Sequence, residues 1–401
     1  MAATKVIDAD GHIIERTDEL RKYLKSPFNK RVGPLTASEP WDRELQQTLP
    51  PEPRAFPSTP TAQDWLKLLD DNGIEQVFLY PTSLGNISRV REPEYAVALA
   101  EAYNNYVYDR YTKFSDRLRP VALLPFQDPE RAVAELRRTV RDLGFRGAVV
   151  RTTGLRLPLG HKFYDPSYRE AETLGCALAV HGTNGGDELA SGAFETFTEV
   201  HTVSFPVGIF VQFSNMIYQG VPARFPKLRL AFLEIGSAWL PYWLDRMDEH
   251  WEKRGRIETP SLKQRPSDCV REHPIFFSFE ADESLLPETF RYVGENHFVY
   301  ATDIPHWDCD SRPICAIRRS ARISPTRLKT SSSPKMPKHC TQSSDDRIRE
   351  LKSSPASSAP QEHIAVLLRQ RRSQERFIAK SSAVIRFRHI RYPWYFRSGN
   401  Q

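Results

Sequence analysis

The feature that most constrains the fold of this chain is a regular alternation of strand-type and helix-type segments over its first 310 residues. Eight short apolar runs each end in polar or turn residues, which is the pattern of parallel strands buried on both faces. Amphipathic segments between them predict helices at 93–111, 129–143 and 239–253. The predicted strands are residues 5–12, 74–81, 117–125, 145–151, 177–182, 228–234, 274–280 and 297–305.

Eight strands that alternate with helices over about 300 residues indicate an α/β protein folded as a closed (β/α)8 TIM barrel. The alternative is an open, doubly wound parallel sheet, which would normally carry a glycine-rich phosphate loop after its first strand. Here the first strand ends in Asp10, Gly11 and His12 instead. We therefore expect the barrel, whose active site lies at the carboxyl ends of its strands.

A proline-rich insertion follows the first predicted strand. Residues 20–63 contain eight prolines, too many for a helix or a central strand. The insertion is placed on the side of the barrel where active sites lie, so it is a candidate substrate lid. A packed surface loop without a catalytic role is an equally good interpretation.

The C-terminal segment differs sharply from the rest in composition. Residues 311–401 contain 15 arginines, 5 lysines, 5 acidic residues, 16 serines and one glycine, which gives a charge of +15. Residues 1–310 carry −9, so the overall charge of +6 describes neither part. We expect a barrel at 1–308 and a tail at 309–401 that is translated out of frame or is a disordered basic arm.

Several classes of protein are excluded or disfavoured by composition. The chain has no run of 18 apolar residues, and its N-terminal segment lacks the apolar core of a signal peptide. Its five cysteines are scattered and form no CxxC pair, which is typical of reduced thiols. The sequence therefore predicts a cytoplasmic protein without membrane contact, and it leaves a homo-oligomer open.

Ionisable residues fall at the ends of several predicted strands. In a barrel these ends converge on one mouth, so residues almost 300 positions apart can meet. A lone acid there can be a helix cap, and a lone histidine can be a satisfied polar group. Several buried charges together are costly without a cation, and imidazole and carboxylate ligands suit a divalent metal. The residues are Asp10, His12, His181, Glu234, Glu280 and Asp303.

Four segments resemble the amidohydrolase-2 branch of the amidohydrolase superfamily, a group that includes aminocarboxymuconate-semialdehyde decarboxylase and γ-resorcylate decarboxylase. The resemblance covers about residues 1–308. It implies that Asp10 and His12 form the metal pair of strand one, that His181 is a further ligand, and that Asp303 binds metal and handles protons. The segments are IDADGH at 7–12, HG at 181–182, GVPARFPKLRLAFLEIGSAWLPYWLDRMDEHW at 220–251 and YATDIPHWD at 300–308.

Two departures from the superfamily pattern affect the expected number of metal ions and the expected catalytic residues. Many members bridge two metals with a carbamylated lysine at strand four, but here that strand ends in Arg151, which cannot form a carbamate. One divalent ion is therefore expected, with zinc favoured and manganese or iron as alternatives. Family decarboxylases usually have a histidine where this chain has Glu234, and His201 or His306 are the rings that could replace it.

Four residues are predicted to contact the substrate: Arg151, Glu280, His306 and Trp307. Arg151 is either a fork for a substrate carboxylate or a structural partner of Glu234 or Glu280. Trp307 could line an aromatic pocket, whereas the aromatic residues of 237–243 are better explained by helix packing.

The sequence thus predicts a metal-dependent hydrolase or carboxy-lyase with Asp303 and Glu234 as catalytic residues. It would decarboxylate or hydrolyse a small carboxylated cyclic or aromatic compound. One alternative is a polyanion-binding protein that uses the basic tail, but no nucleic-acid module is recognisable. Another is a barrel whose catalysis is impaired because the tail replaces its last helix.

Overall fold

The computed structural model describes residues 6–36, 56–183, 194–280 and 283–309 of the chain. These residues form an α/β fold with parallel strands, which confirms the predicted class. One sheet has the order β1 (Val6–Ile13), β2 (Ile74–Pro81) and β3 (Leu118–Pro120). The other runs in sequence order through β4 (Ala122–Leu123), β5 (Gly147–Arg151), β6 (Ala177–His181), β7 (Leu230–Leu233), β8 (Ile275–Phe279) and β9 (Phe298–Tyr300).

Main-chain hydrogen bonds continue the pairing beyond the two sheets. The predicted strand at 117–125 is divided into β3 and β4, and the intervening Val121 donates to Leu79 O at 3.0 Å. At the opposite ends, His12 N donates to Ile304 O at 2.7 Å. The segment after β9 therefore lies beside β1, although the two are almost the full length of the described chain apart.

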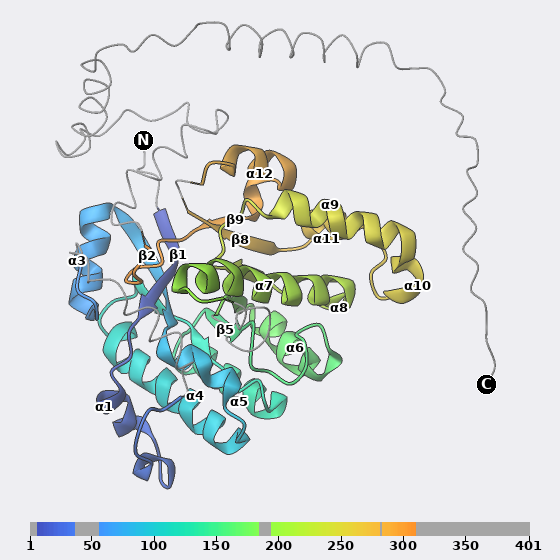
Figure 1. Ribbon diagram of the computed structural model, residues 1–401. Helices are drawn as coiled ribbons and strands as arrows, with labels where there is room; N and C mark the ends of the chain where they lie inside the picture. Colours follow the sequence, from blue (N-terminus) through green and yellow to red (C-terminus); the bar gives the residue numbers. More distant parts are fainter. Residues whose placement is uncertain (1–5, 37–55, 184–193, 281–282, 310–401) are drawn as a thin grey trace, which may run out of the picture. The chain divides into compact units, whose positions relative to one another are not determined.

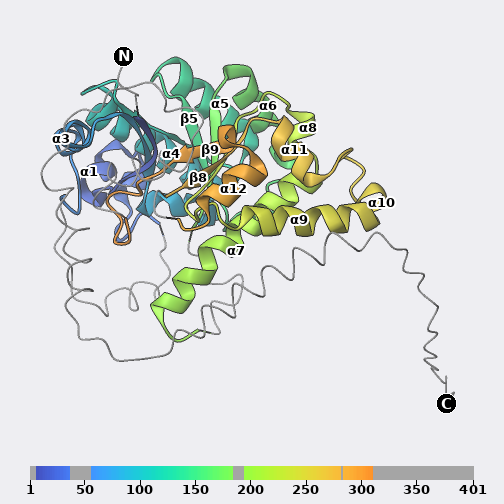
Figure 2. The same cartoon turned by 90° about the horizontal axis from the view of Figure 1, so that it is seen from above.

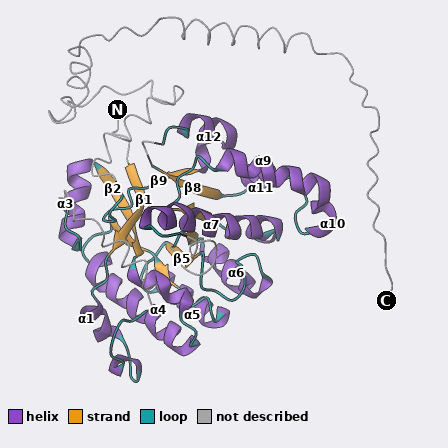
Figure 3. Ribbon diagram, viewed as in Figure 1, coloured by secondary structure: helices purple, strands orange, loops and turns teal. Residues whose placement is uncertain are grey.

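Helices surround the strands in Figures 1 and 3. The predicted helices are confirmed, and two of them end in a π-helical turn, at Tyr108–Thr112 and Trp251–Gly255. Thr61 caps α3 through a capping box, and Gly73 ends it in the left-handed conformation. The longer helices are α3 (Ala62–Asn72), α4 (Pro93–Val107), α5 (Pro129–Arg141), α6 (Asp165–Leu174), α7 (Phe197–Tyr218), α9 (Leu240–His250), α11 (Pro266–Glu272) and α12 (Leu286–Val293). Short helices are α1 (Thr17–Leu20), α8 (Val221–Arg224) and α10 (Arg256–Glu258).

Helix α7 is the longest of the helices that the sequence pattern did not predict; α3, α6, α11 and α12 are the other long ones. Its 22 residues are apolar on most sides, and Pro206 lies inside it, so no amphipathic period is visible. Length and composition alone would allow this helix to cross a membrane. Here Phe213 packs against the rings of Phe232 and Phe277 in β7 and β8, and Figure 2 shows the first turns extending beyond the strands.

Two predictions concern residues outside the described ranges. Residues 37–55 of the proline-rich insertion and the whole segment 310–401 belong to this group. The lid and the nature of the tail therefore stay predictions. Within the described part of the insertion, residues 21–23 and 28–30 form short 3-10 turns.

Candidate metal centre

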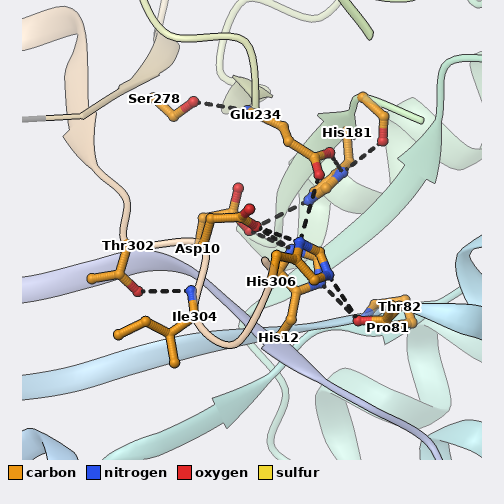
Figure 4. A network of polar contacts seen from close by, with 12 residues as sticks. Asp10, His12, Pro81, Thr82, His181, Glu234, Ser278, Thr302, Ile304 and His306 are labelled. Atoms are coloured by element: carbon orange, nitrogen blue, oxygen red, sulfur yellow. Dashed lines mark hydrogen bonds and ion pairs between the residues drawn. The ribbon is translucent and has the colours of Figure 1, made fainter. Parts of the chain in front are cut away.

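Three of the four predicted metal ligands, Asp10, His12 and His181, point toward one another in Figure 4. Asp10 Oδ1 lies 3.4 Å from His12 Nε2 and 3.4 Å from His181 Nε2. The fourth, Asp303, places Oδ1 3.2 Å from His12 Nε2. Asp10 and both histidines are buried, whereas Asp303 is 15% exposed. The carboxyl ends of β1 and β6 and the loop after β9 thus bring the four side chains together.

The backbone around Asp303 is held in an unusual conformation. Its φ of 56° lies in the left-handed region, which few residues other than glycine adopt. Its N–H donates to Asp10 O at 2.8 Å, so the loop is attached directly to β1. Such conformations persist where the surrounding structure fixes them, and they cluster at functional sites.

Asp8 lies on the same strand, but it serves as an anchor for the loop. Its carboxylate accepts hydrogen bonds from Thr302 Oγ1 at 2.6 Å, from Thr302 N and from Asp10 N. Burial raises the pKa of Asp8 to about 7 despite these bonds. Since both oxygens have partners, Asp8 stabilises the strand-to-loop contact beside the cluster.

The facing atoms of the four side chains make no hydrogen bond in the described part of the protein. These atoms are Asp10 Oδ1 and Oδ2, His12 Nε2, His181 Nε2 and Asp303 Oδ1. Buried polar atoms without partners are rare because desolvation is costly. The spacings of 3.2–3.4 Å match the edge of about 3.4 Å expected between ligands that each lie about 2.1 Å from one ion. Asp10, His12 and His181 offer atoms that all lie within 4.8 Å of one another and so fit a divalent metal, whereas Asp303 reaches this group through its contact with His12.

Protonation of the two imidazoles reflects the carboxylates that contact each of them. Burial by itself would lower the pKa of His12, but the neighbouring carboxylates of Asp10 and Asp303 raise it to about 9. For His181, burial and the charge of Arg151 are outweighed by Glu234 and Asp10, and the pKa is again about 9. Burial would raise the pKa of Asp303, yet the charge of His306 and the nearby His12 hold it low. Metal binding must therefore displace protons.

Glu234 and His306 flank the four residues. Glu234 Oε2 lies 2.6 Å from His181 Nδ1. His306 Nδ1 lies 2.8 Å from Asp303 Oδ1, and its ring centroid is 4.0 Å from that of His12. An alternative set of potential ligands therefore overlaps the first, consisting of His12, Glu234, Asp303 and His306. Of the two rings considered as replacements for a histidine at position 234, His306 is the one beside the cluster.

Arg151 is buried, and its guanidinium faces the main chain. Nη1 donates to Gly182 O at 2.7 Å and also contacts His181 Nδ1, while Nη2 donates to Pro81 O at 2.5 Å. Nη1 is 3.8 Å from Glu234 Oε2. These contacts favour the structural interpretation of this arginine.

A cavity of about 390 Å³ opens beside the cluster. All four predicted substrate contacts line it, together with Asp10, Glu234 and Asp303. At its mouth the His201 ring lies 5.3 Å from Trp307 and 4.5 Å from Phe205. The aromatic residues of 237–243 do not line this cavity; Trp239 and Trp243 pack against Phe210 of α7.

Sequence reasoning missed several cavity residues. Thr82 directly follows β2, and its Oγ1 lies 3.3 Å from His12 Nδ1 and 3.2 Å from His306 Nε2. Its position at a strand end is a signal that could have identified it. Phe205 gave no such signal, because it comes from the unpredicted helix α7.

This chain is similar to a known protein family and to a characterised enzyme. The family model described as amidohydrolase matches residues 7–317. The γ-resorcylate decarboxylase of Rhodococcus jostii is 34% identical over 267 residues, covering 60% of this chain and 76% of that protein.

Two solved structures share the fold. An amidohydrolase from Mycobacterium avium subsp. paratuberculosis superposes with a TM-score of 0.66 at 19% identity, over 80% of this chain and 97% of the other. A dihydroxybenzoic acid decarboxylase from Polaromonas, solved with manganese and the inhibitor 2-nitroresorcinol, gives 0.60 at 18% identity, over 80% and 92%. At these identities the superpositions speak for the fold alone.

Proposed function

Because this chain belongs to the amidohydrolase family and is an enzyme of carboxy-lyase or hydrolase chemistry, we propose that it decarboxylates a small carboxylated aromatic compound. The observation that carries the proposal is the set of buried, unbonded donor atoms beside a cavity lined by aromatic side chains. The similarity to γ-resorcylate decarboxylase favours loss of CO2 from a hydroxylated benzoate.

We further propose that the two sheets form one closed barrel of eight strands, with β3 and β4 together as the third. The hydrogen bond from Val121 to Leu79 supports closure on one side, and the bond from His12 to Ile304 supports it on the other. Closure would place the four potential metal ligands at a single mouth.

Asp10, His12, His181 and Asp303 would hold the metal ion. When bound, the ion would engage substrate oxygens and stabilise the negative charge that develops during the reaction. Zinc is our first expectation, and manganese is the alternative suggested by the Polaromonas structure. A mixed set of imidazoles and carboxylates suits either metal.

Asp303 is proposed to transfer the proton. Its side chain faces the cavity and lies within hydrogen-bond distance of His306, which provides a route for proton exchange. Protonation of the ring carbon that carries the carboxyl group would precede cleavage of the C–C bond, and CO2 would leave as the ring regains aromaticity. Glu280, His306 and Trp307 would contact the substrate, and Arg151 would form part of the inner wall.

Hydrolysis is the second candidate, and Glu234 is the observation that favours it. A carboxylate at this position could accept a proton from an attacking water molecule, whereas the histidine usual in family decarboxylases could also donate one to the substrate. The same cavity and the same metal ligands would serve both reactions.

Elemental analysis combined with a substrate assay tests the proposal. We expect about one divalent metal per chain, lost in His12→Ala and His181→Ala but retained in His201→Ala, whose ring lies at the mouth. With 2,6-dihydroxybenzoate and related benzoates as probes, Asp303→Asn should lower CO2 release at least about 100-fold. A protein that contains no metal after growth with zinc or manganese would contradict the metal site, and CO2 release unaffected by Asp303→Asn would contradict the role of Asp303.

A further inference from the structure

The Nδ1 atom of His181 lies close to two oxygen atoms that accept a proton and to one nitrogen atom that donates one. Gly182 O lies within hydrogen-bond geometry of Nδ1 at 2.8 Å, and the Glu234 carboxylate forms an ion-pair contact through Oε2 at 2.6 Å; both oxygens can only accept a proton. The guanidinium Nη1 of Arg151 also contacts this atom, and arginine can only donate. A neutral imidazole carries a proton on one nitrogen and a lone pair on the other. The neighbours of Nδ1 therefore decide the state of Nε2.

Which nitrogen of His181 carries the proton is important, because Nε2 faces Asp10 and the proposed metal position. If Nδ1–H donates to Glu234, the Nε2 lone pair is free to bind a metal. If Nδ1 accepts from Arg151, the proton lies on Nε2 and blocks that position. Carboxylates that accept from the outer nitrogen of a ligating histidine generally fix its tautomer and orientation.

The local structure is arranged to place a carboxylate here. Glu234 has a φ of 82°, a left-handed conformation that is unfavourable for a residue with a Cβ atom. Its N–H donates to Ser278 Oγ at 2.9 Å, which holds this conformation (Figure 4). On the other side, a Cβ atom on Gly182 would lie 3.2 Å from Glu234 Oε2, so the glycine leaves space for the carboxylate.

Other contacts hold Arg151 in place beside His181. Its Nη1 and Nη2 donate to the carbonyls of Gly182 and Pro81, and Glu234 Oε2 lies 3.8 Å from Nη1. Gly85 packs directly against the guanidinium, which leaves no room there for a Cβ atom. The arginine is thus fixed next to His181 as a donor, and Glu234 is the charged acceptor that opposes it.

We propose that Glu234 is a positioning residue that keeps the proton of His181 on Nδ1 against the competing donor Arg151, and thereby leaves Nε2 free for the metal. The inference rests on the metal site proposed above. A histidine at position 234 would serve this role less well than the glutamate does, because an imidazole near Arg151 is a weaker acceptor.

Zinc affinity tests this proposal, measured on stripped protein by competition with a chelator. Glu234→Leu should weaken Zn²⁺ binding about 10- to 100-fold, the usual effect of losing such a partner. Glu234→Gln should stay within a few-fold of the wild type, because its amide oxygen still accepts from Nδ1. The double variant Glu234→Leu/Arg151→Met should recover much of the loss. Glu170→Leu, which removes a similarly buried glutamate that pairs with Arg137 and does not line the cavity, is the matched control and should change affinity little.

A second readout does not depend on metal binding or on the stability of the double variant. At pH 10, long-range ¹H–¹⁵N spectra of histidine side chains report the tautomer of metal-free protein directly. We expect His181 to carry its proton on Nδ1 in the wild type and on Nε2 in Glu234→Leu.

Two results would overturn the inference. Unchanged zinc affinity and an unchanged tautomer in Glu234→Leu would reduce Glu234 to a structural residue. A loss of more than about 1,000-fold in Glu234→Gln as well as in Glu234→Leu would make Glu234 a direct ligand. Failure of the wild type to bind any metal would instead contradict the proposed function, and the tautomer measurement would still decide the role of Glu234.

Discussion

At the scale of single residues, the centre of the molecule carries more acid than base. His12 contacts both Asp10 and Asp303, and His181 contacts Asp10 and Glu234. In the metal-free protein both imidazoles are therefore held in the protonated form well above their usual pKa of 6.5. The metal replaces these protons as the partner of the acids, so proton and metal compete for the same atoms.

This competition predicts how stability depends on pH. The folded pKa of both histidines, about 9, exceeds the unfolded value of 6.5. Their contribution is thus complete below about pH 6.5 and is lost as the pH rises through 9. We expect the unfolding free energy of metal-free protein, measured in urea with a chelator, to fall between pH 6.5 and 9, and that of zinc-saturated protein to fall much less over this range.

The variant His12→Gln/His181→Gln is the control for this pH dependence. It should lack most of the decrease between pH 7.5 and 8.5, because Asp8, with a pKa of about 7, completes its own loss of stability at lower pH. The buried thiols of Cys176 and Cys269, whose pKa is raised from 9.0 to about 12, lower stability mainly above this range in both proteins. A metal-free wild type whose stability is constant from pH 7.5 to 10 would contradict the assigned pKa values.

At the scale of elements, strand β1 is packed unusually closely against helix α3. A Cβ atom on Gly11 would lie 2.7 Å from Trp65 Cη2 and 2.8 Å from Val77 Cγ2, both in the buried core. Gly11 lies between Asp10 and His12, and the pairing of β1 with β2 is irregular just before it, between Asp8 and Gly11. The close approach therefore fixes the part of the strand that carries two of the proposed ligands.

Gly11→Ala should consequently destabilise the protein by about 1–3 kcal/mol, the usual cost of overpacking a core. The matched control is Gly147→Ala in β5, where the nearest atom to the new Cβ would be Val121 Cγ1 at 3.2 Å. Thermal or urea unfolding of both variants measures the difference. Equal and small losses would show that the contact with Trp65 relaxes freely.

The elements also show what a sequence can predict here and what it cannot. The strands were predictable because each is a short apolar run, and Asp10, His12 and His181 were predictable because they stand at or near strand ends. Asp303 was predicted to end the strand at 297–305, and its motif supported the same site, but it lies beyond the end of β9 in a loop with a left-handed residue. Helix α7 was not predictable from periodicity, because its partly buried sides remove the contrast between apolar and polar faces.

At the scale of the whole molecule, the chain divides into parts of opposite charge. Every residue proposed to bind metal or substrate lies between positions 10 and 308, where the charge is negative, whereas residues 311–401 carry +15. The basic tail is therefore separate from the proposed chemistry in sequence and in charge. Its origin in another reading frame stays a prediction that retranslation of the underlying DNA can test.

Removal of residues 311–401 should show that metal binding and DNA binding depend on different parts of the chain. We expect the truncated chain to keep the metal content of the full chain, because none of the proposed ligands is removed. Retention on DNA at low salt should be present in the full chain and lost on truncation, since polyanion binding depends on the number of basic contacts. Loss of metal upon truncation, measured by elemental analysis of folded protein, would show that the tail contributes to the site.

Because Asp303 donates a hydrogen bond to Asp10, the site can form only after Asp303 has been synthesised. Strand β1 leaves the ribosome 293 residues before its partner residue is made, because the two positions are that far apart. At about 5–20 residues per second, the nascent strand waits roughly 15–60 s for this contact. Throughout that interval the growing polypeptide exposes an unpaired edge with two acids, Asp8 and Asp10, and lacks a complete set of ligands, so metal capture follows the translation of residues 1–303.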